Sequence, residues 1–231
     1  IVFSKNMKNQ INSLISPIKR DCKVNHPGVD KKFSISQKNI NKSSKFPADK
    51  KIILYVGRVV KEKNIELLIK SFYILDRNDS ILLIVGDGED RHQYNDLVKK
   101  LKIEDKVFFE GFKSNTEYYY NIATYLVLPT RYEAFGQVII ESIACGTPVI
   151  GFRSNPPYTK VATDEIIEHY KTGFLVDEYG EKNLSSMLNI AINYSYKNEY
   201  FKMRKNCIGA VKNDYNWQRF VENIIEMTNK N

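Results

Sequence analysis

Short, nearly continuous apolar runs alternate with amphipathic stretches through the middle of this 231-residue chain. The runs are rich in Ile, Leu and Val and lie at residues 52–57, 81–86, 106–112, 124–129 and 147–152. A strand that is covered on both faces is apolar at successive positions, so these runs predict buried parallel strands. The stretches between them have helical spacing and lie at residues 64–75, 90–101, 115–122 and 134–144. The pattern predicts an α/β fold with a doubly wound, Rossmann-like parallel sheet.

The two ends of the chain have different patterns. Residues 1–49 begin with a strand-like run and finish in a polar stretch that is typical of a linker. Residues 181–229 have a helical pattern, and the last helix repeats apolar side chains at i, i+3 and i+4 from Trp217 onward. We therefore expect a helical C-terminal tail. Because the strand-like run starts at once with Ile1, we also expect the chain to begin inside a longer protein.

The composition leaves the partner open. Lys and Arg number 35 and Asp and Glu 27, which gives a net charge of +8. This surplus favours an anionic ligand, a nucleic acid or a lipid surface, although most cations are interleaved with polar residues as on solvated helix faces. The three cysteines lie far apart, which argues against a disulfide framework or a zinc site. No apolar run approaches the ~20 residues of a membrane span. We expect a cytoplasmic protein with at most a peripheral contact at the inner membrane face.

Two cations follow the first predicted strand. In a doubly wound sheet the ligand crevice lies at the carboxyl ends of the strands, so chemistry is expected in the loops that follow them. Arg58 stands directly after the strand, and Lys63 stands five residues later at the start of a helix. An arginine fork and a lysine point charge can converge on a diphosphate. A surface loop with scattered charge explains this pair equally well.

A loop and a short helix follow the strand at 124–129. Gly136 to Ala144 have helical spacing, and Gly146 and Pro148 predict the helix end. The first N–H groups of a helix have no partner within it, so they can bind an anion such as a phosphate. These groups belong to Phe135, Gly136, Gln137 and Val138.

Two glutamates flank this helix start. Glu133 lies in the loop above the sheet, and Glu141 projects from the helix. A carboxylate at the place of Glu141 can accept hydrogen bonds from two neighbouring hydroxyls of a ribose. Glu133 would face whatever lies beyond the phosphates. Taken singly, a solvated loop acid and a helix-surface acid remain the simpler interpretations.

Taken together, five segments resemble the C-terminal donor-binding domain of family 4 retaining glycosyltransferases, also called glycosyl transferases group 1, which have the two-domain GT-B fold. The segments read "YVGRVVKEKNIELLIKSF", "LLIVGDGED", "KVFFEGF", "EAFGQVIIESIACGTPVIGF" and "KTGFLV". The likeness spans roughly residues 50 to 180. Five motifs in order on consecutive loops are far more specific than any one of them.

The resemblance implies roles for residues of this chain. Arg58 and Lys63 would hold the donor diphosphate, Glu133 the donor sugar and Glu141 the ribose, so that Arg58, Lys63 and Glu133 are the expected catalytic residues. The remaining expected donor-binding residues are Gly57, Gly86, Gly88, Phe108, Phe109, Phe135, Gly136, Gln137 and Val138. For Phe108 and Phe109, which would line the base, a place in the strand core is the alternative.

The resemblance also implies the partners. Residues 1–49 would be the end of an upstream acceptor domain plus the interdomain linker, and residues 50–231 the nucleotide-sugar-binding domain. The substrates would be a nucleotide diphosphate sugar and a glycan or lipid-linked acceptor, with no cofactor, no metal and no nucleic acid. The departing diphosphate gains charge while the sugar becomes oxocarbenium-like, so two cations at the diphosphate can serve where a metal would.

The chain departs from the family pattern at two places. Pro27 in "HPGVDKKF" replaces an asparagine that is common at the interdomain hinge. The stretch "RSNPPYTKVATDE" replaces a shorter Gly-rich loop, so donor contacts there are in doubt. The family's important histidine lies in the upstream domain, and His26, His92 and His169 are therefore expected to have surface or packing roles.

Three other functions remain open. A nucleotide-sugar-binding module without activity would need only the donor half. A nucleotide-sugar 2-epimerase shares the fold and some motifs, and would release a free epimerised sugar. Nucleic-acid binding would rest on the net charge of +8 and on base stacking by Tyr118 to Tyr120. Consecutive tyrosines point in different directions on a helix, which disfavours this last reading.

Overall fold

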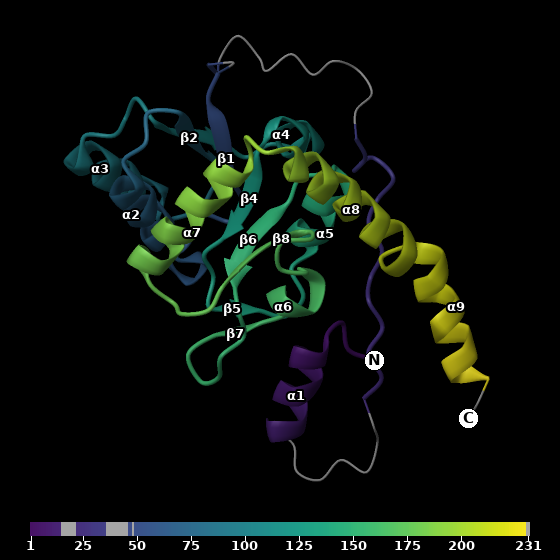
Figure 1. Ribbon diagram of the computed structural model, residues 1–231. Coiled ribbons are helices and arrows are strands. Elements are labelled where there is room, and N and C mark those ends of the chain that lie inside the picture. The colour runs from purple at the N-terminus through teal and green to yellow at the C-terminus, as the bar shows by residue number, and fades with distance from the viewer. Residues whose placement is uncertain (15–21, 36–45, 48, 230–231) are drawn as a thin grey trace.

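The computed structural model of this chain describes residues 1–14, 22–35, 46, 47 and 49–229. Six parallel strands form one sheet in the order β3-β2-β1-β4-β6-β8, which places β1 and β4 at its centre (Figure 1). The strands are β1 (Lys51–Val56), β2 (Ser80–Val85), β3 (Val107–Gly111), β4 (Tyr125–Leu128), β6 (Val149–Phe152) and β8 (Gly173–Val176). The predicted α/β class and the five predicted strands are confirmed, and a sixth strand, β8, completes the Rossmann-like order.

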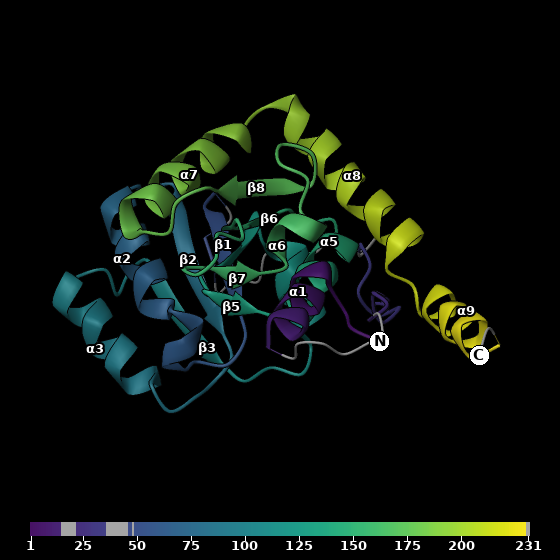
Figure 2. The ribbon, with the colours of Figure 1, turned by 90° about the horizontal axis from the view of Figure 1, so that it is seen from below.

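Helices cover both faces of the sheet (Figure 2). In β1, Ile52 and Leu54 face one hydrophobic core, and Ile53 and Tyr55 face the other, because successive side chains of a strand point to opposite faces. The second core is closed by α2 (Ile65–Leu75), α3 (Arg91–Leu101) and α7 (Glu181–Tyr194). The first is closed by α4 (Thr116–Ile122), α5 (Gln137–Ala144), α6 (Thr163–Ile166) and α8 (Asn198–Asp214). Each fully buried Ile or Leu stabilises the fold by roughly 1.5 to 3 kcal/mol.

A second, two-stranded sheet stands apart from the main one. It pairs β5 (Tyr132–Glu133) with β7 (Lys160–Val161) in parallel, in the register Tyr132↔Lys160 and Glu133↔Val161. The Ala162 N–H also donates to the Glu133 carbonyl. This small sheet fixes the loop that carries Glu133 against the stretch that replaces the expected Gly-rich loop.

The segment before the sheet is docked on it. The helix α1 (Lys5–Leu14) follows Val2, which forms a parallel bridge with Val24. Further along, Phe33 and Phe46 are buried and belong to the core closed by α5 and α8. The linker therefore contributes side chains to the folded core, although its composition is polar.

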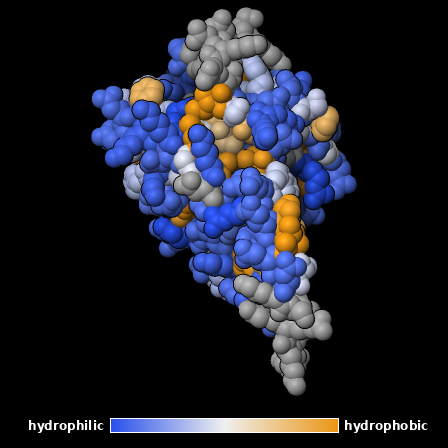
Figure 3. All heavy atoms as spheres, turned by 90° about the vertical axis from the view of Figure 1, so that its right-hand side faces the viewer, coloured by the Kyte–Doolittle hydropathy of each residue, from blue (hydrophilic) through white to orange (hydrophobic). Residues whose placement is uncertain are grey.

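The last helix, α9 (Trp217–Thr228), contains no buried residue. Trp217, Val221 and Ile225 are each at least half exposed. The side of the molecule that carries α9 accordingly shows apolar patches within a mostly hydrophilic surface (Figure 3). The predicted helical tail is confirmed, and its apolar stripe lies largely in solvent. Among the helices that the structure describes, none combines the length and apolar character that a bilayer crossing requires.

Candidate functional site

Two cavities lie side by side at the carboxyl end of β1. Each has a volume of about 190 Å³, and Val56 and Gly57 line both of them. The Lys63 cavity is further lined by Tyr55, Lys63, Leu128, Pro129, Thr130, Glu133, Gly136, Gln137 and Val138. The Arg58 cavity is further lined by Arg58, Val85, Gly86, Asp87, Phe112, Lys113 and Thr116. Because they share a wall, we refer to both together as the strand-end cleft. It occupies the position where doubly wound sheets bind ligands.

A charge pair lies in the Lys63 cavity. The Lys63 Nζ donates to Glu133 Oε2 over 2.9 Å, and the two side chains are only 24% and 20% exposed. Lys63 comes from a short 3₁₀ helix, η1 (Lys61–Lys63), and Glu133 comes from β5. Sequence reasoning singled out both residues but not their contact. The opposite charges of Lys63 and Glu133 balance each other among the residues that line this cavity.

Arg58 lies in the other half of the cleft. Its side chain is exposed, and its guanidinium has no hydrogen-bond acceptor among the residues that the structure describes. Its backbone carbonyl accepts a hydrogen bond from the Tyr55 hydroxyl over 2.8 Å. Tyr55 is buried in the core, so this bond ties the Arg58 backbone to the sheet while its side chain stays free for a ligand.

The start of α5 forms one wall of the Lys63 cavity. Gly136 precedes the helix with φ 87°, and a Cβ there would lie 2.7 Å from the Ile139 Cδ1. Only glycine fits this position without strain. The N–H groups of Gly136, Gln137 and Val138 find no acceptor in the described part of the chain. They can therefore bind an anion in the cavity. The Phe135 ring instead packs in the core, 5.8 Å from the ring of His26.

Glu141 lies on the same face of α5 as Gln137 and Val138, one turn further along, because it follows them at i+4 and i+3. It does not line either cavity. The Tyr120 hydroxyl donates to Glu141 Oε2 over 2.9 Å. Burial raises the pKa of the Glu141 carboxyl, and this hydrogen bond partly opposes the rise. Glu141 is thus held beside the cleft rather than inside it.

The raised pKa of Glu141 predicts a pH-dependent cost to folding. The ionised carboxylate is less favourable in the folded than in the unfolded chain, so the cost is present at neutral pH and fades as pH falls through the raised pKa. Glutamine keeps an acceptor for Tyr120 and cannot ionise. We expect Glu141→Gln to melt at a higher temperature than the wild type at pH 7, with the difference shrinking towards pH 4.

Thermal unfolding at both pH values checks this prediction. The control is Glu62→Gln, because Glu62 is exposed on η1 and should leave the melting temperature unchanged at either pH. A Glu141→Gln protein that is less stable than the wild type at pH 7 would show that the ionised carboxylate contributes a favourable contact in the fold.

Glycines bring the loops after β1 and β2 into backbone contact. A Cβ at Gly86 would lie 1.8 Å from the Gly57 carbonyl oxygen, and one at Gly88 would lie 2.3 Å from the Val59 carbonyl oxygen. The Gly86 N–H also donates to the Gly111 carbonyl, which adds the end of β3 to the same junction. Gly57 and Gly86 line the cleft, whereas Gly88 does not.

For Phe108 and Phe109 the structure shows packing in the strand core, which was the alternative to a place beside the base. These residues alternate along β3, so Phe108 packs against one core and Phe109 against the other, and neither lines the strand-end cleft. The same segment reaches the cleft through Phe112, which is 78% exposed, and through Lys113 and Thr116. These residues belong to the loop and helix start that follow β3, and ligands of doubly wound sheets bind at the carboxyl ends of the strands.

The three histidines lie apart and have separate roles. His26 packs between Phe135 and Tyr215. His169 accepts a hydrogen bond from the Leu175 N–H, and burial lowers the pKa of its imidazole. His92 is exposed on α3. These places agree with the expected packing and surface roles.

Comparison with known proteins places the chain in a family context. The family model described as glycosyl transferases group 1 matches residues 36–214. An uncharacterized glycosyltransferase of Methanocaldococcus jannaschii is 35% identical over 159 residues, which are 65% of this chain and 41% of that protein. The N-acetyl-alpha-D-glucosaminyl L-malate synthase of Bacillus anthracis is 29% identical over 177 residues, which are 75% of this chain and 45% of that protein. The chain thus spans less than half the length of these relatives.

A solved structure shows the same fold. Anabaena HepE in complex with UDP and glucose superposes with a TM-score of 0.86 at 18% identity, over 99% of this chain and 62% of that one. At this identity the likeness establishes the fold alone, which is a Rossmann-like α/β fold of the kind found in GT-B glycosyltransferases.

Proposed function

The chain belongs to the group 1 glycosyltransferases, and from this premise we propose that it is the donor-binding half of a retaining enzyme that transfers a sugar from a nucleotide diphosphate sugar to a glycan or lipid-linked acceptor. One observation supports this above all. Lys63 and the free N–H groups at the start of α5 line one cavity of the strand-end cleft, and Arg58 lines the adjoining cavity, which shares Val56 and Gly57 with it. Three groups that favour negative charge surround the place where a diphosphate would lie.

Each group then has a role at the donor. Lys63 and the N–H groups of α5 would bind the phosphate next to the sugar, and Arg58 the phosphate next to the nucleoside. Phe112, Lys113 and Thr116 would line the base, in the place we first assigned to Phe108 and Phe109. Glu141 would receive the ribose hydroxyls at the edge of the cleft, where α5 presents it one turn beyond Val138.

The Lys63–Glu133 pair explains how binding of the donor can prepare the reaction. A diphosphate competes with Glu133 for the Lys63 ammonium group, and the released carboxylate can then accept hydrogen bonds from the sugar hydroxyls. When the bond from the sugar to the diphosphate breaks, the cations and the helix start stabilise the charge that grows on the leaving group. The acceptor would attack from the face that the diphosphate leaves, so that configuration is retained.

The remaining parts of the proposal concern the rest of the protein. Residues 1–49 would be the end of an upstream acceptor domain and its linker, which fits a chain that covers 41% and 45% of its relatives' lengths. The acceptor would approach from that side. No cofactor and no metal are assigned, because the chain's own cations can neutralise the diphosphate.

Titration calorimetry combined with a turnover assay tests the proposal. UDP-glucose is the first donor to try, since UDP and glucose are named for the HepE structure, and GDP-mannose and ADP-glucose follow. Binding together with sugar transfer by the whole protein supports the enzyme. Binding without transfer indicates a module without activity, and release of a free epimerised sugar indicates a 2-epimerase. If none of the three donors binds, the proposed function is wrong.

A further inference from the structure

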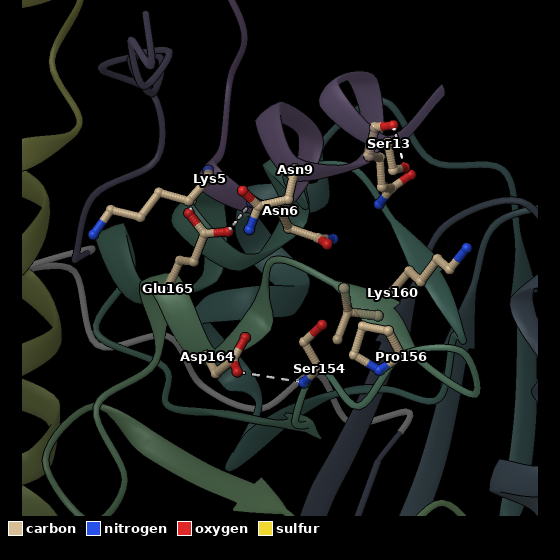
Figure 4. Close-up of a pocket in the computed structure, with 11 residues that line it drawn as sticks. Lys5, Asn6, Asn9, Ser13, Ser154, Pro156, Lys160, Asp164 and Glu165 are labelled. Atoms are coloured by element: carbon tan, nitrogen blue, oxygen red, sulfur yellow. Dashed lines mark hydrogen bonds between the residues drawn. The ribbon is translucent and has the colours of Figure 1, made fainter. Parts of the chain in front are cut away.

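A third cavity lies between α1 and the segment 154–165. Its volume is about 560 Å³, against about 190 Å³ for each half of the strand-end cleft. Figure 4 shows side chains from both walls directed into it. None of its lining residues belongs to the strand-end cleft, so it is a separate site.

One wall is a polar face of α1. Its residues have neutral side chains that can form hydrogen bonds, and they recur at i, i+3, i+4 and i+7 along the helix. They are Asn6, Asn9, Gln10 and Ser13. The helix is fixed in place because Glu165 accepts hydrogen bonds from the N–H groups of Lys5 and Asn6 over 2.7 and 2.6 Å. The Asn6 Nδ2 is buried and has no partner among the residues described. Asn6 thus lines the cavity with an amide donor that no described residue satisfies.

The chemistry of the lining favours a neutral ligand with many hydroxyls. An amide side chain both donates and accepts, as a sugar hydroxyl does, so a row of amides can follow a sugar ring. The charges are balanced, with Lys5 and Lys160 against Asp164 and Glu165. A phosphate or a nucleic acid would instead require a surplus of cations, such as the strand-end cleft has.

The cavity lies next to the loop that carries Glu133. Lys160 and Val161 line it, and these two residues form β7, which is paired with Tyr132 and Glu133 of β5. On the α1 side, the Ser4 hydroxyl donates to the carbonyl of Ala134. The β5–β7 sheet therefore contributes to both cavities, through Lys160 and Val161 here and through Glu133 in the Lys63 cavity.

We propose that this cavity binds a sugar residue of the acceptor, with the amide face of α1 as its recognition surface. That the sugar belongs to the acceptor rests on the proposed function, whereas the binding of a sugar at α1 can be tested separately. It also gives a use to the stretch 153–165, which replaces the expected Gly-rich loop and forms the opposite wall.

The test follows the side-chain NH₂ signals of Asn and Gln by NMR in the ¹⁵N-labelled 231-residue chain. The probes are methyl α-glucoside, methyl α-galactoside, methyl α-mannoside and N-acetylglucosamine, each added to about 50 mM, which saturates a site of millimolar affinity. We expect saturable shifts of the Asn6, Asn9 and Gln10 signals with at least one probe. The combined change Asn9→Ala and Gln10→Ala should weaken its binding at least ~10-fold.

Alanine favours helix at both positions, so the double variant should fold, and its backbone spectrum checks this. The matched control is Asn12→Ala, since Asn12 is exposed on the same helix and does not line the cavity; it should leave sugar affinity unchanged. If no probe shifts the α1 amides, or if the double variant binds as tightly as the control, the sugar site is refuted. UDP is titrated into the same samples. If UDP does not bind to a chain that binds the sugar probe, the proposed donor half is refuted and the sugar site is not.

Discussion

Changing Arg58 to alanine is expected to lower the turnover of the whole protein ~10- to 200-fold. A charge-assisted hydrogen bond contributes ~1.5 to 3 kcal/mol, and each 1.36 kcal/mol is a factor of ten in rate. The guanidinium is exposed at the cleft, and the backbone carbonyl that holds the loop is untouched by the change. Turnover should therefore fall while the melting temperature stays the same.

The matched control for Arg58 is Lys61→Ala. Lys61 is an exposed cation three residues further along the same loop, and its side chain lines neither half of the strand-end cleft. Removing it changes the net charge by the same amount, so a general electrostatic effect would appear in both variants. Equal turnover of the Arg58→Ala protein and the wild type would exclude Arg58 from the mechanism.

The second large effect is expected for Gly86→Ala. The new Cβ would lie 1.8 Å from the Gly57 carbonyl oxygen, and Gly86 has φ 135°, which L residues rarely adopt. Backbone strain and overpacking each cost about 1 to 3 kcal/mol, so we expect a loss of about 2 to 6 kcal/mol in the free energy of unfolding. The loops after β1 and β2 would also move apart, and nucleotide affinity should fall with stability.

Urea unfolding of the 231-residue chain measures this change. The control is Gly209→Ala, because Gly209 lies within α8 and a Cβ there would meet nothing within 4 Å. Alanine should stabilise that helix by about 0.5 to 1 kcal/mol. The two glycines thus predict effects of opposite sign for the same substitution. A Gly86→Ala protein as stable as the wild type would show that the two loops do not require their close approach.

Local patterns in the sequence predicted most of the sheet. Strands such as β1 and β2 are apolar along their whole length because both faces are buried, and the helix α5 ends at Ala144, as Gly146 and Pro148 indicated. The strands β5 and β7 have two residues each, which is too short for any period to show. Their pairing, which positions Glu133, could be found only from the fold.

The candidate site was predicted less completely than the sheet. The sequence singled out Arg58, Lys63 and Glu133, because loops after strands and the family resemblance point to them. The Lys63–Glu133 contact joins residues 70 positions apart, and no local pattern reports such a pair. Phe112 lines the cleft but was not named from the sequence, because aromatic residues inside a strand, such as Phe108 and Phe109, give a stronger hydrophobic signal than an exposed one just beyond it.

The contacts of the N-terminal segment could not be predicted from the sequence either. The hydrogen bond from the Lys5 N–H, at the start of α1, to the Glu165 carboxylate joins positions 160 residues apart. Both residues line the third cavity. The amide spacing on α1 was visible in the sequence, yet an amphipathic polar face is usually solvated, so it carried no signal until the opposite wall was known.

A crystal structure of the chain with bound UDP tests the central claim most directly. We predict that the diphosphate lies in the strand-end cleft, within hydrogen-bond distance of Arg58, Lys63 and the first N–H groups of α5, and that Lys63 turns from Glu133 to a phosphate oxygen. UDP bound elsewhere, or a Lys63–Glu133 pair that stays closed beside it, would contradict the account.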